Sequence, residues 1–255
     1  MLLAIDVGNT QTVVGMFSGL ELADHWRIAT DAERTSDELA LMVNQFLGFH
    51  GSSFKEAHIT GVAISSVVPR VTAALRDMTE RYFGFPPLVI EPGVRTGMPI
   101  LYDNPKEVGA DRIANAIGAY DLYGGPTIVV DFGTATTIEA ISAKGEYLGG
   151  AIFPGVEISM DALFGRAAGL RRVELITPKH AIGKSTVESI QAGAVYGFSG
   201  QVDALVDRFQ AEIGICTVVA TGGLAELIMP HSRAMQHHEP WLTLYGLRIV
   251  FERNL

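Results

Sequence analysis

The chain has a single cysteine, Cys216, among its 255 residues, and it has no long uninterrupted apolar run. One cysteine cannot form an internal disulfide, which is typical of proteins from a reducing compartment. A membrane-spanning helix needs about 18 or more apolar residues in succession. The chain starts with a strand pattern rather than a basic segment followed by an apolar one, so we expect no signal peptide. These features predict a cytoplasmic protein.

Positive charge is also scarce. The chain has 19 lysine and arginine residues against 28 acidic ones, which gives a formal net charge of −9. Because negative charge repels nucleic-acid phosphates and anionic lipids, we expect no nucleic acid and no membrane as a partner. The sequence also lacks the Gly-x-x-x-x-Gly-Lys-Ser/Thr run that binds phosphates in many nucleotide-binding proteins. Its histidines show no metal-ligand spacing, so we expect no zinc site.

One short pattern occurs twice. An apolar strand at residues 2–5 runs into Asp6-Val7-Gly8-Asn9-Thr10, and a second at residues 127–130 runs into Asp131-Phe132-Gly133-Thr134. Glycine has no side chain to keep a ligand away from the backbone N–H groups of such a turn. An aspartate can hold a hydrated cation, and threonine hydroxyls can donate to phosphate oxygens. Two such turns facing each other would clamp a nucleotide polyphosphate, whereas the simpler alternative is that each aspartate caps its own turn.

The order of elements is repeated as well. Three strand patterns occupy residues 2–29, and three more follow the break at Gly124-Gly125-Pro126, each set being succeeded by helical patterns. This order predicts two similar α/β domains, residues 1–115 and 116–255, each a mixed sheet with flanking helices. Ligands of open sheets bind beyond the strand ends, so we expect a nucleotide cleft between the domains.

The later part of the chain gives three further expectations. Apolar spacing predicts separate helices at residues 186–196 and 199–212. Residues 229–240 are polar, and we expect an exposed loop there. Cys216 precedes a strand pattern, which favours a place in the core over a role as nucleophile.

The two turns, together with a late Thr-Gly-Gly at residues 221–223, resemble the actin-like ATPase, hexokinase and Hsp70 superfamily, whose domains are actin-like (ribonuclease H-like). Within it, four segments resemble the type III pantothenate kinase family. They are residues 6–10, Gly-Ala-Asp-Arg at 109–112, residues 131–137, and Gly-Lys-Ser-Thr at 183–186 with Gly193 following. One departure is Ala-Ala-Gly-Leu-Arg at 167–171, where the family more often has Thr-Ala-x-Leu-Pro; we expect it to alter the loop and not the chemistry.

The resemblance implies an ATP-dependent kinase that converts pantothenate to 4′-phosphopantothenate, the first step of coenzyme A biosynthesis. Asp6 would lie near Mg²⁺ and bind it through water, because Mg²⁺ keeps several of its waters. Asp131 would bind a monovalent cation, K⁺ or NH₄⁺, which offsets phosphate charge. The implied ATP-binding residues are Asp6, Val7, Gly8, Asn9, Thr10, Gln11, Thr12, Val13, Thr134, Gly222 and Gly223.

The resemblance also makes Asp111 the general base that accepts the proton of the substrate hydroxyl. The implied pantothenate contacts are Tyr102, Gly109, Ala110, Asp111, Arg112 and Thr186. Simpler roles stay open at this point. Asp111 is also a favourable acid at a helix start, Tyr102 a packing residue, and Thr186 a helix cap.

Two other functions fit the same fold, namely a kinase of another small hydroxy acid or sugar, and a non-enzymatic ATP-binding regulator. The greater usual length of sugar kinases and the presence of Asp111 argue against them. The segment 155–170 is apolar with little charge, which favours a homodimer interface over a helix buried in its own domain. The resembling family forms homodimers with pantothenate bound near the subunit boundary.

Overall fold

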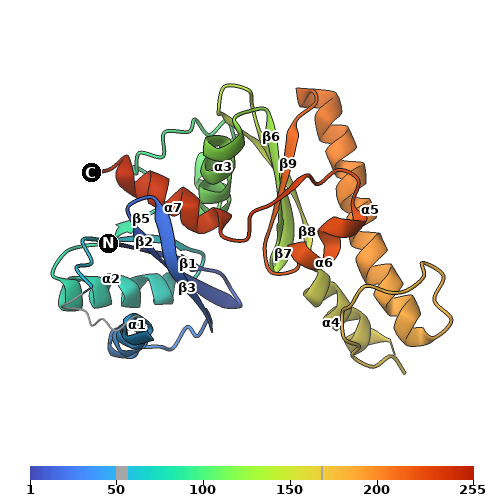
Figure 1. Cartoon of the computed structure of the whole chain (residues 1–255), viewed down its shortest axis with the longest axis horizontal. Coiled ribbons are helices and arrows are strands. Elements are labelled where there is room, and N and C mark those ends of the chain that lie inside the picture. Colours follow the sequence, from blue (N-terminus) through green and yellow to red (C-terminus); the bar gives the residue numbers. More distant parts are fainter. Residues whose placement is uncertain (50–56, 168) are drawn as a thin grey trace. The chain divides into compact units, whose positions relative to one another are not determined.

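The computed structural model describes residues 1–49, 57–167 and 169–255. Its contacts divide the chain into two compact units, whose elements are labelled in Figure 1. The first unit comprises Met1–Gly97, Asp103–Gly118 and Thr243–Leu255, and the second comprises Met98–Tyr102 and Ala119–Leu242. Each unit is therefore assembled from separate stretches of sequence. A single domain boundary after residue 115 stays a prediction.

The first unit is built on a five-stranded mixed sheet with the strand order β3-β2-β1-β4-β5. Strands β1, β2 and β3 form an antiparallel meander, and β4 and β5 add to it in parallel. The three strands predicted at residues 2–29 are confirmed. The strands are β1 (Leu2–Val7), β2 (Gln11–Ser18), β3 (Glu21–Ala29), β4 (Gly61–Ser66) and β5 (Leu88–Val89).

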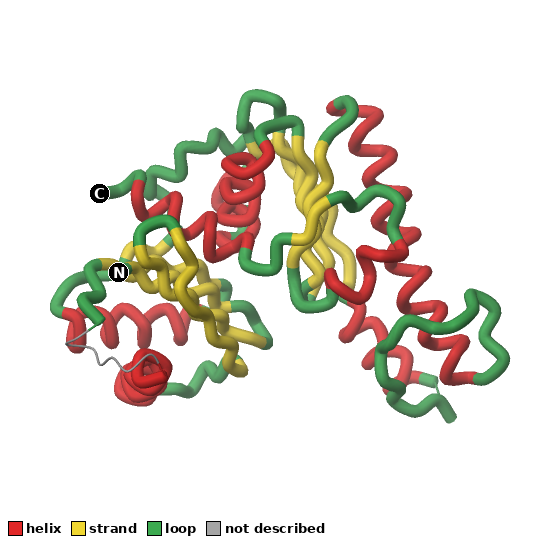
Figure 2. The backbone as a smooth tube through the Cα atoms, viewed as in Figure 1, coloured by secondary structure: helices red, strands yellow, loops and turns green. Residues whose placement is uncertain are grey.

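Helices cover both faces of this first sheet, as Figure 2 shows. Helices α1 (Ser36–Phe49) and α2 (Pro69–Phe83) share a buried apolar core with Leu3, Ile5 and Val7 of β1. Residues in between point to the opposite face because side chains alternate along a strand. Asp6 is therefore on the face away from α1 and α2.

Helix α7 (Leu242–Glu252) packs on that opposite face. Tyr245 meets Phe17 of β2 edge-on, with ring centroids 5.8 Å apart. The helix also packs against α3 (Ala110–Tyr123), where a Cβ atom built at Gly246 would lie 1.9 Å from the carbonyl oxygen of Ala114. The C-terminal helix is thus a structural part of the first unit.

The second unit repeats the first sheet's topology, with the order β10-β9-β6-β7-β8. Strands β6, β7 and β8 form an antiparallel meander, and β9 and β10 add in parallel beside β6. Strand β6 is therefore the counterpart of β1. The strands are β6 (Thr127–Phe132), β7 (Ala135–Ile141), β8 (Tyr147–Pro154), β9 (Thr217–Thr221) and β10 (His237–His238).

One face of the second sheet shares its core with helices α5 (Thr186–Ile213) and α6 (Ala225–Ile228), and α4 (Val156–Arg166) follows β8. Ile128 and Val130 belong to this core, so the alternating Val129 and Asp131 are on the other face. Our prediction of two helices at residues 186–212 is wrong. Buried residues keep helical spacing through residues 196–199, and α5 is continuous.

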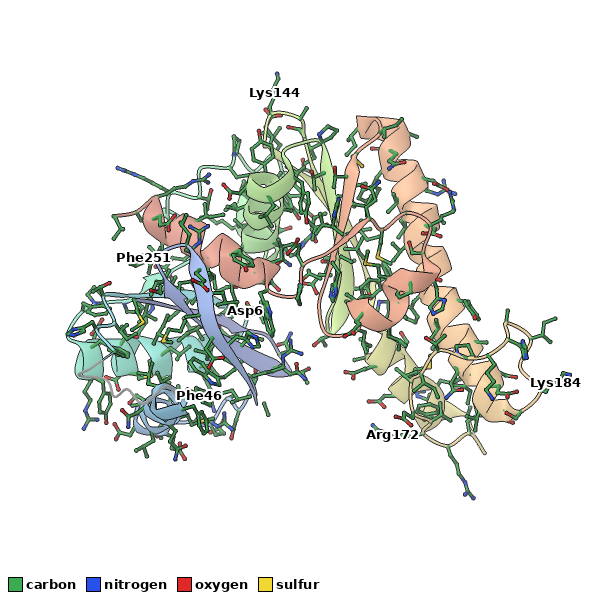
Figure 3. All side chains as sticks on the ribbon, viewed as in Figure 1. Asp6, Phe46, Lys144, Arg172, Lys184 and Phe251 are labelled. Atoms are coloured by element: carbon green, nitrogen blue, oxygen red, sulfur yellow. The ribbon has the colours of Figure 1, made fainter. Side chains whose placement is uncertain are left out.

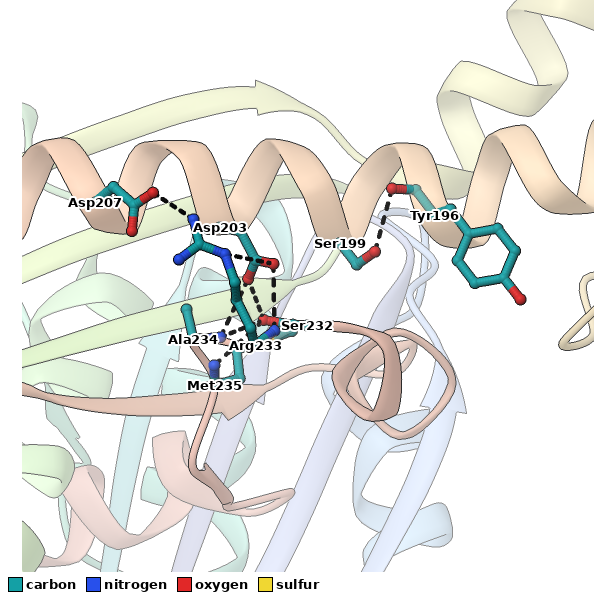
Figure 4. Close-up of polar contacts among 8 residues, drawn as sticks. All are labelled: Tyr196, Ser199, Asp203, Asp207, Ser232, Arg233, Ala234 and Met235. Atoms are coloured by element: carbon teal, nitrogen blue, oxygen red, sulfur yellow. Dashed lines mark hydrogen bonds and ion pairs between the residues drawn. The ribbon is translucent and has the colours of Figure 1, made fainter. Parts of the chain in front are cut away.

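The prediction of an exposed loop at residues 229–240 is also wrong. The segment contains the short strand β10, and Met235 is buried in the core. Asp203 of α5 holds it in place, because its carboxylate accepts hydrogen bonds from the Ser232 hydroxyl at 2.5 Å and from the Ala234 N–H at 3.2 Å (Figure 4). The polar residues of this segment thus fix its backbone to Asp203 and do not indicate exposure to solvent.

The contact between α7 and α3 gives a stability prediction. Gly246→Ala should lower the free energy of unfolding by about 1–3 kcal/mol, the usual cost of overpacking, because the added carbon would meet backbone that cannot move aside. Gly200→Ala, within α5, is the matched control because nothing lies within 4 Å of a Cβ atom there. It should stabilise by about 0.5–1 kcal/mol. Urea denaturation measures both, and equal effects of the two variants would contradict the packing.

Candidate active site

The first Asp-x-Gly turn joins β1 to β2 and carries most of the residues predicted to bind ATP. The Gly8 N–H donates to the Gln11 carbonyl at 3.0 Å and closes the turn. The Thr30 hydroxyl donates to the Gly8 carbonyl at 2.8 Å and lies 2.9 Å from the Thr12 hydroxyl. Asp6, labelled in Figure 3, is half-buried at the end of β1. Thr30 therefore stabilises this turn through its hydroxyl, a role that the sequence did not predict.

The second turn joins β6 to β7 and is one residue tighter than the first. The Gly133 N–H donates to the Ala135 carbonyl at 3.1 Å, and Thr134 is exposed at the tip. A Cβ atom built at Gly222 would lie 2.5 Å from Asp131 Oδ1, and Gly222 has a φ angle of +90° that favours glycine. The end of β6 and the end of β9 therefore meet, which brings together Asp131, Gly133 and Gly222.

A buried hydroxyl lies beside each aspartate on the adjoining parallel strand. Ser65 of β4 is in register with Asp6, and Thr221 of β9 is in register with Asp131. Their exposed fractions are 0% and 2%. Partners in register on neighbouring strands share a face of the sheet, so each carboxylate has a hydroxyl as neighbour. The sequence signal was the repeated position of these hydroxyls at the end of the strand.

Each of these two donor sets is a carboxylate with one neighbouring hydroxyl. One carboxylate with neighbouring hydroxyls fits Mg²⁺, which binds proteins through one or two carboxylates and keeps several waters. A Cβ atom at position 222 would overlap Asp131 Oδ1 and the backbone of Phe132, so only glycine lets the end of β9 approach this carboxylate so closely. Across the described residues, no three or more histidine, cysteine, aspartate or glutamate side chains are grouped as ligands of one metal.

Asp111 lies in the first turn of α3. Its Oδ1 atom accepts a hydrogen bond from the Arg112 N–H at 2.8 Å, and a Cβ atom at Gly109 would lie 2.4 Å from the same oxygen. Glycine at 109 therefore leaves room for this carboxylate. Ala110 is buried, and Arg112 is only 8% exposed. Asp111 therefore lies at the positive end of the helix dipole, where an acidic side chain is favourable.

Tyr102 and Thr186 belong to the second unit. Tyr102 is half-buried, with its ring centroid 6.4 Å from that of Tyr147. Thr186 is exposed as the first residue of α5. The helix is capped by Ser185, whose hydroxyl accepts from the Glu188 N–H at 3.2 Å. Thr186 is thus not the cap, and the alternative role considered for it is wrong.

The predicted site residues therefore fall into two sets. The first unit holds residues 6–13 and 109–112, and the second holds Tyr102, Asp131, Thr134, Thr186 and Gly222 with Gly223.

Cys216 is 5% exposed in the apolar core of the second unit, as predicted, and burial raises the pKa of its thiol. Ala168, within the segment that departs from the family pattern, lies outside the described residues. Among the described helices, none combines the length and apolar character needed to cross a membrane.

Solved structures with the same fold include a dehydratase component and a kinase. Component A of the (R)-2-hydroxyglutaryl-CoA dehydratase of Acidaminococcus fermentans aligns with a TM-score of 0.57 at 14% identity, over 98% of this chain and 95% of that one. The inorganic polyphosphate/ATP-glucomannokinase of Arthrobacter sp. strain KM aligns with a TM-score of 0.51 at 15% identity, over 98% and 97%. The chain therefore has the two-domain fold of the actin-like ATPases and related kinases.

Sequence comparison narrows this class. A model of the type III pantothenate kinase family matches residues 2–208. Proteins named type III pantothenate kinase are 58% identical in Moorella thermoacetica, over all of both chains, and 56% identical in Streptomyces avermitilis, over 100% of this chain and 99% of the relative. The chain belongs to the type III pantothenate kinase family.

Proposed function

We propose that this protein transfers the γ-phosphoryl group of ATP to the primary hydroxyl of pantothenate and forms 4′-phosphopantothenate, the first step of coenzyme A biosynthesis. The observation that carries the proposal is family membership over the full chain, at 58% identity to the Moorella thermoacetica enzyme. The excess of acidic residues supports a protein that works without nucleic-acid or membrane partners, and the single cysteine supports a cytoplasmic one.

The two Asp-x-Gly turns bind the phosphates of ATP. At the first turn, backbone N–H groups and the Thr10 hydroxyl donate to phosphate oxygens, and Asp6 would hold Mg²⁺ through water. At the second turn, the hydroxyl of Thr134 donates to phosphate oxygens. The carboxylate of Asp131 would hold K⁺ or NH₄⁺. Gly222 and Gly223 leave backbone room for the nucleoside. Bound cations supply the positive charge that an acidic chain without a phosphate-binding lysine loop needs.

Asp111 acts on the acceptor. Its carboxylate orients the hydroxyl of pantothenate and accepts the proton as the oxygen bonds to the γ-phosphorus and the bond to the leaving ADP breaks. Arg112 binds the pantothenate carboxylate, since a guanidinium fork matches carboxylate geometry. Tyr102, Gly109, Ala110 and Thr186 complete the acceptor site. Positioning and charge neutralisation supply most of the catalysis.

A single comparison tests the function against its alternatives. ATP turnover is measured with pantothenate, with glucose, with acetate and with no acceptor. We expect ATP turnover only when pantothenate is the acceptor. Turnover with a different acceptor would identify another kinase, and ATP binding without turnover would identify a regulator.

The general base gives the first prediction. Asp111→Asn keeps the size of the side chain but removes its capacity to accept a proton, so kcat should fall by about 10²–10⁴-fold, the scale of general-base catalysis. Pantothenate binding, measured by calorimetry, should be largely kept. Asp121→Asn, an exposed position on the same helix, is the control and should retain parental kcat. A kcat for Asp111→Asn close to that of the parent would contradict the assignment.

The cations give the second prediction. Activity should require a divalent ion and should rise when K⁺ or NH₄⁺ replaces Na⁺. Asp131→Ala should abolish the response to the monovalent ion because it removes the charged ligand. Steady-state rates in matched chloride buffers measure this. Equal rates of the parent protein in all three buffers would show that Asp131 does not serve a monovalent cation.

We also propose a homodimer in which α4 contributes to the interface. Of the residues of α4, Val156 is buried, whereas Ile158 and Leu163 are 42% and 38% exposed in the single chain. An apolar helix with this exposure is typical of an interface, and a two-fold dimer is the commonest assembly. The exposure argues against the alternative that α4 is buried in its own domain.

Charge on this helix should therefore split the dimer. Ile158→Glu should shift the mass measured by light scattering at micromolar concentration from two chains to one, because a buried unpaired carboxylate opposes association. It should also weaken the use of pantothenate if the partner closes that site. Leu41→Glu is the control, since Leu41 on α1 is 66% exposed and belongs to the first unit, whereas α4 belongs to the second. A parent protein with the mass of one chain would refute the dimer.

A further inference from the structure

A glutamate is buried in the second sheet next to the segment that carries Tyr102. Glu139 lies in β7 among apolar neighbours, and its exposed fraction is 0%. Burying a carboxyl group is costly unless it is hydrogen-bonded. Its carboxylate accepts a hydrogen bond from the hydroxyl of Tyr147, the first residue of β8, which is also 0% exposed. None of the roles proposed above uses this pair.

Tyr147 also anchors the segment Met98–Tyr102 through its backbone. The Leu101 N–H donates to the Tyr147 carbonyl at 2.8 Å, and the Tyr147 N–H donates to the Pro99 carbonyl at 2.9 Å. The residue between them, Ile100, forms a parallel bridge with Tyr147. These bonds explain why Met98–Tyr102 belongs to the second unit although the chain on both sides of it belongs to the first.

The Tyr102 ring is placed by the same strand. A Cβ atom built at Gly149 would lie 3.5 Å from Tyr102 Cε2, so the ring rests against the backbone of β8. At Gly150 a Cβ atom would lie 2.7 Å from Glu139 Oε2. Glu139 thus contacts Tyr147, and Tyr147 contacts the segment of Tyr102. Gly150 and Gly149 leave room on β8 for the side chains of Glu139 and Tyr102, respectively.

This arrangement is on the face of the sheet that carries Asp131. Glu139 is in register with Val129 of β6, and Thr137 is in register with Asp131. Residues two apart on a strand share a face, so Glu139 and Asp131 point to the same side. The backbone bonds to Tyr147 place the segment with Tyr102 along the β8 edge of this sheet, next to the Glu139–Tyr147 pair.

We propose that Glu139 and Tyr147 are positioning residues for pantothenate, which fix Tyr102 and its loop segment in the orientation that the substrate needs. The proposal rests on the proposed function and on the role of Tyr102 within it. Glu139 holds the Tyr147 hydroxyl, Tyr147 holds the backbone of residues 99–101, and Tyr102 follows directly. Neither Glu139 nor Tyr147 contacts the substrate.

Tyr147→Phe tests the proposal because it removes one hydroxyl and keeps the ring. The KM for pantothenate should rise about tenfold, the scale of a lost buried hydrogen bond, while kcat and the KM for ATP stay within about twofold of the parent. Amide hydrogen exchange in a peptide covering residues 98–104 should become faster without substrate, because the Leu101 N–H loses a firmly held partner.

The chain offers a matched control. Tyr123 also donates its hydroxyl to a glutamate, Glu239, within the second unit. Tyr123→Phe removes the same type of bond, and it should leave the KM for pantothenate and the exchange of residues 98–104 unchanged. Glu139→Gln keeps an acceptor for the Tyr147 hydroxyl and should stay close to the parent, whereas Glu139→Leu should reproduce the effect of Tyr147→Phe.

Several results would overturn the proposal. A Tyr147→Phe protein with lower thermal stability but parental pantothenate KM would show that the pair has only a structural role. An equal rise in both KM values, or the same change in Tyr123→Phe, would show a general loss of packing. If the parent protein does not use pantothenate, the proposed function fails and the substrate role of the pair fails with it. The exchange measurement, made without substrate, still decides separately whether Glu139 and Tyr147 anchor the segment.

Discussion

The constraint on which the rest of the structure depends is a carboxylate at the end of the central strand of each sheet. Asp6 and Asp131 need buried apolar strands to fix them and glycine turns to leave space beside them, so the surrounding sequence has little freedom. Because both sheets have the same strand order, they place an aspartate and a neighbouring hydroxyl in the same way. In the proposed function, this acidic chain binds a polyphosphate through cations and backbone N–H groups rather than through lysine.

Much of the structure around these two aspartates could be predicted from the sequence, because it depends on residues that are close together along the chain. The alternation of apolar residues predicted the strands around Asp6 and Asp131, and the glycines after them predicted the turns. The beginning of α3 followed from Gly109 and Asp111 in the same way. Local patterns also indicated the family, since its four segments are short and lie in a fixed order along the chain.

What the sequence did not predict depends on partners that are distant along the chain. Helix α7 joins the first unit because Gly246 allows it to approach Ala114, a contact that no local pattern encodes. The segment after residue 229 was polar, yet it is ordered by Asp203. The burial of Glu139 was not predicted, because a single acidic residue in a strand is usually exposed. Its position on the same face of the sheet as Asp131 could have indicated a structural or functional role.

The acceptor residues link the two units through the chain itself. Tyr102 belongs to the second unit and Asp111 to the first, and a short connector, residues 103–110, joins them. If Glu139 and Tyr147 fix the second-unit end of this connector, and the start of α3 fixes the other end, then the proposed pantothenate binding and proton acceptance depend on anchors in both units. A buried carboxyl is well suited to such an anchor, since losing its hydrogen bond leaves a costly unpaired group and so favours one arrangement of the loop over others.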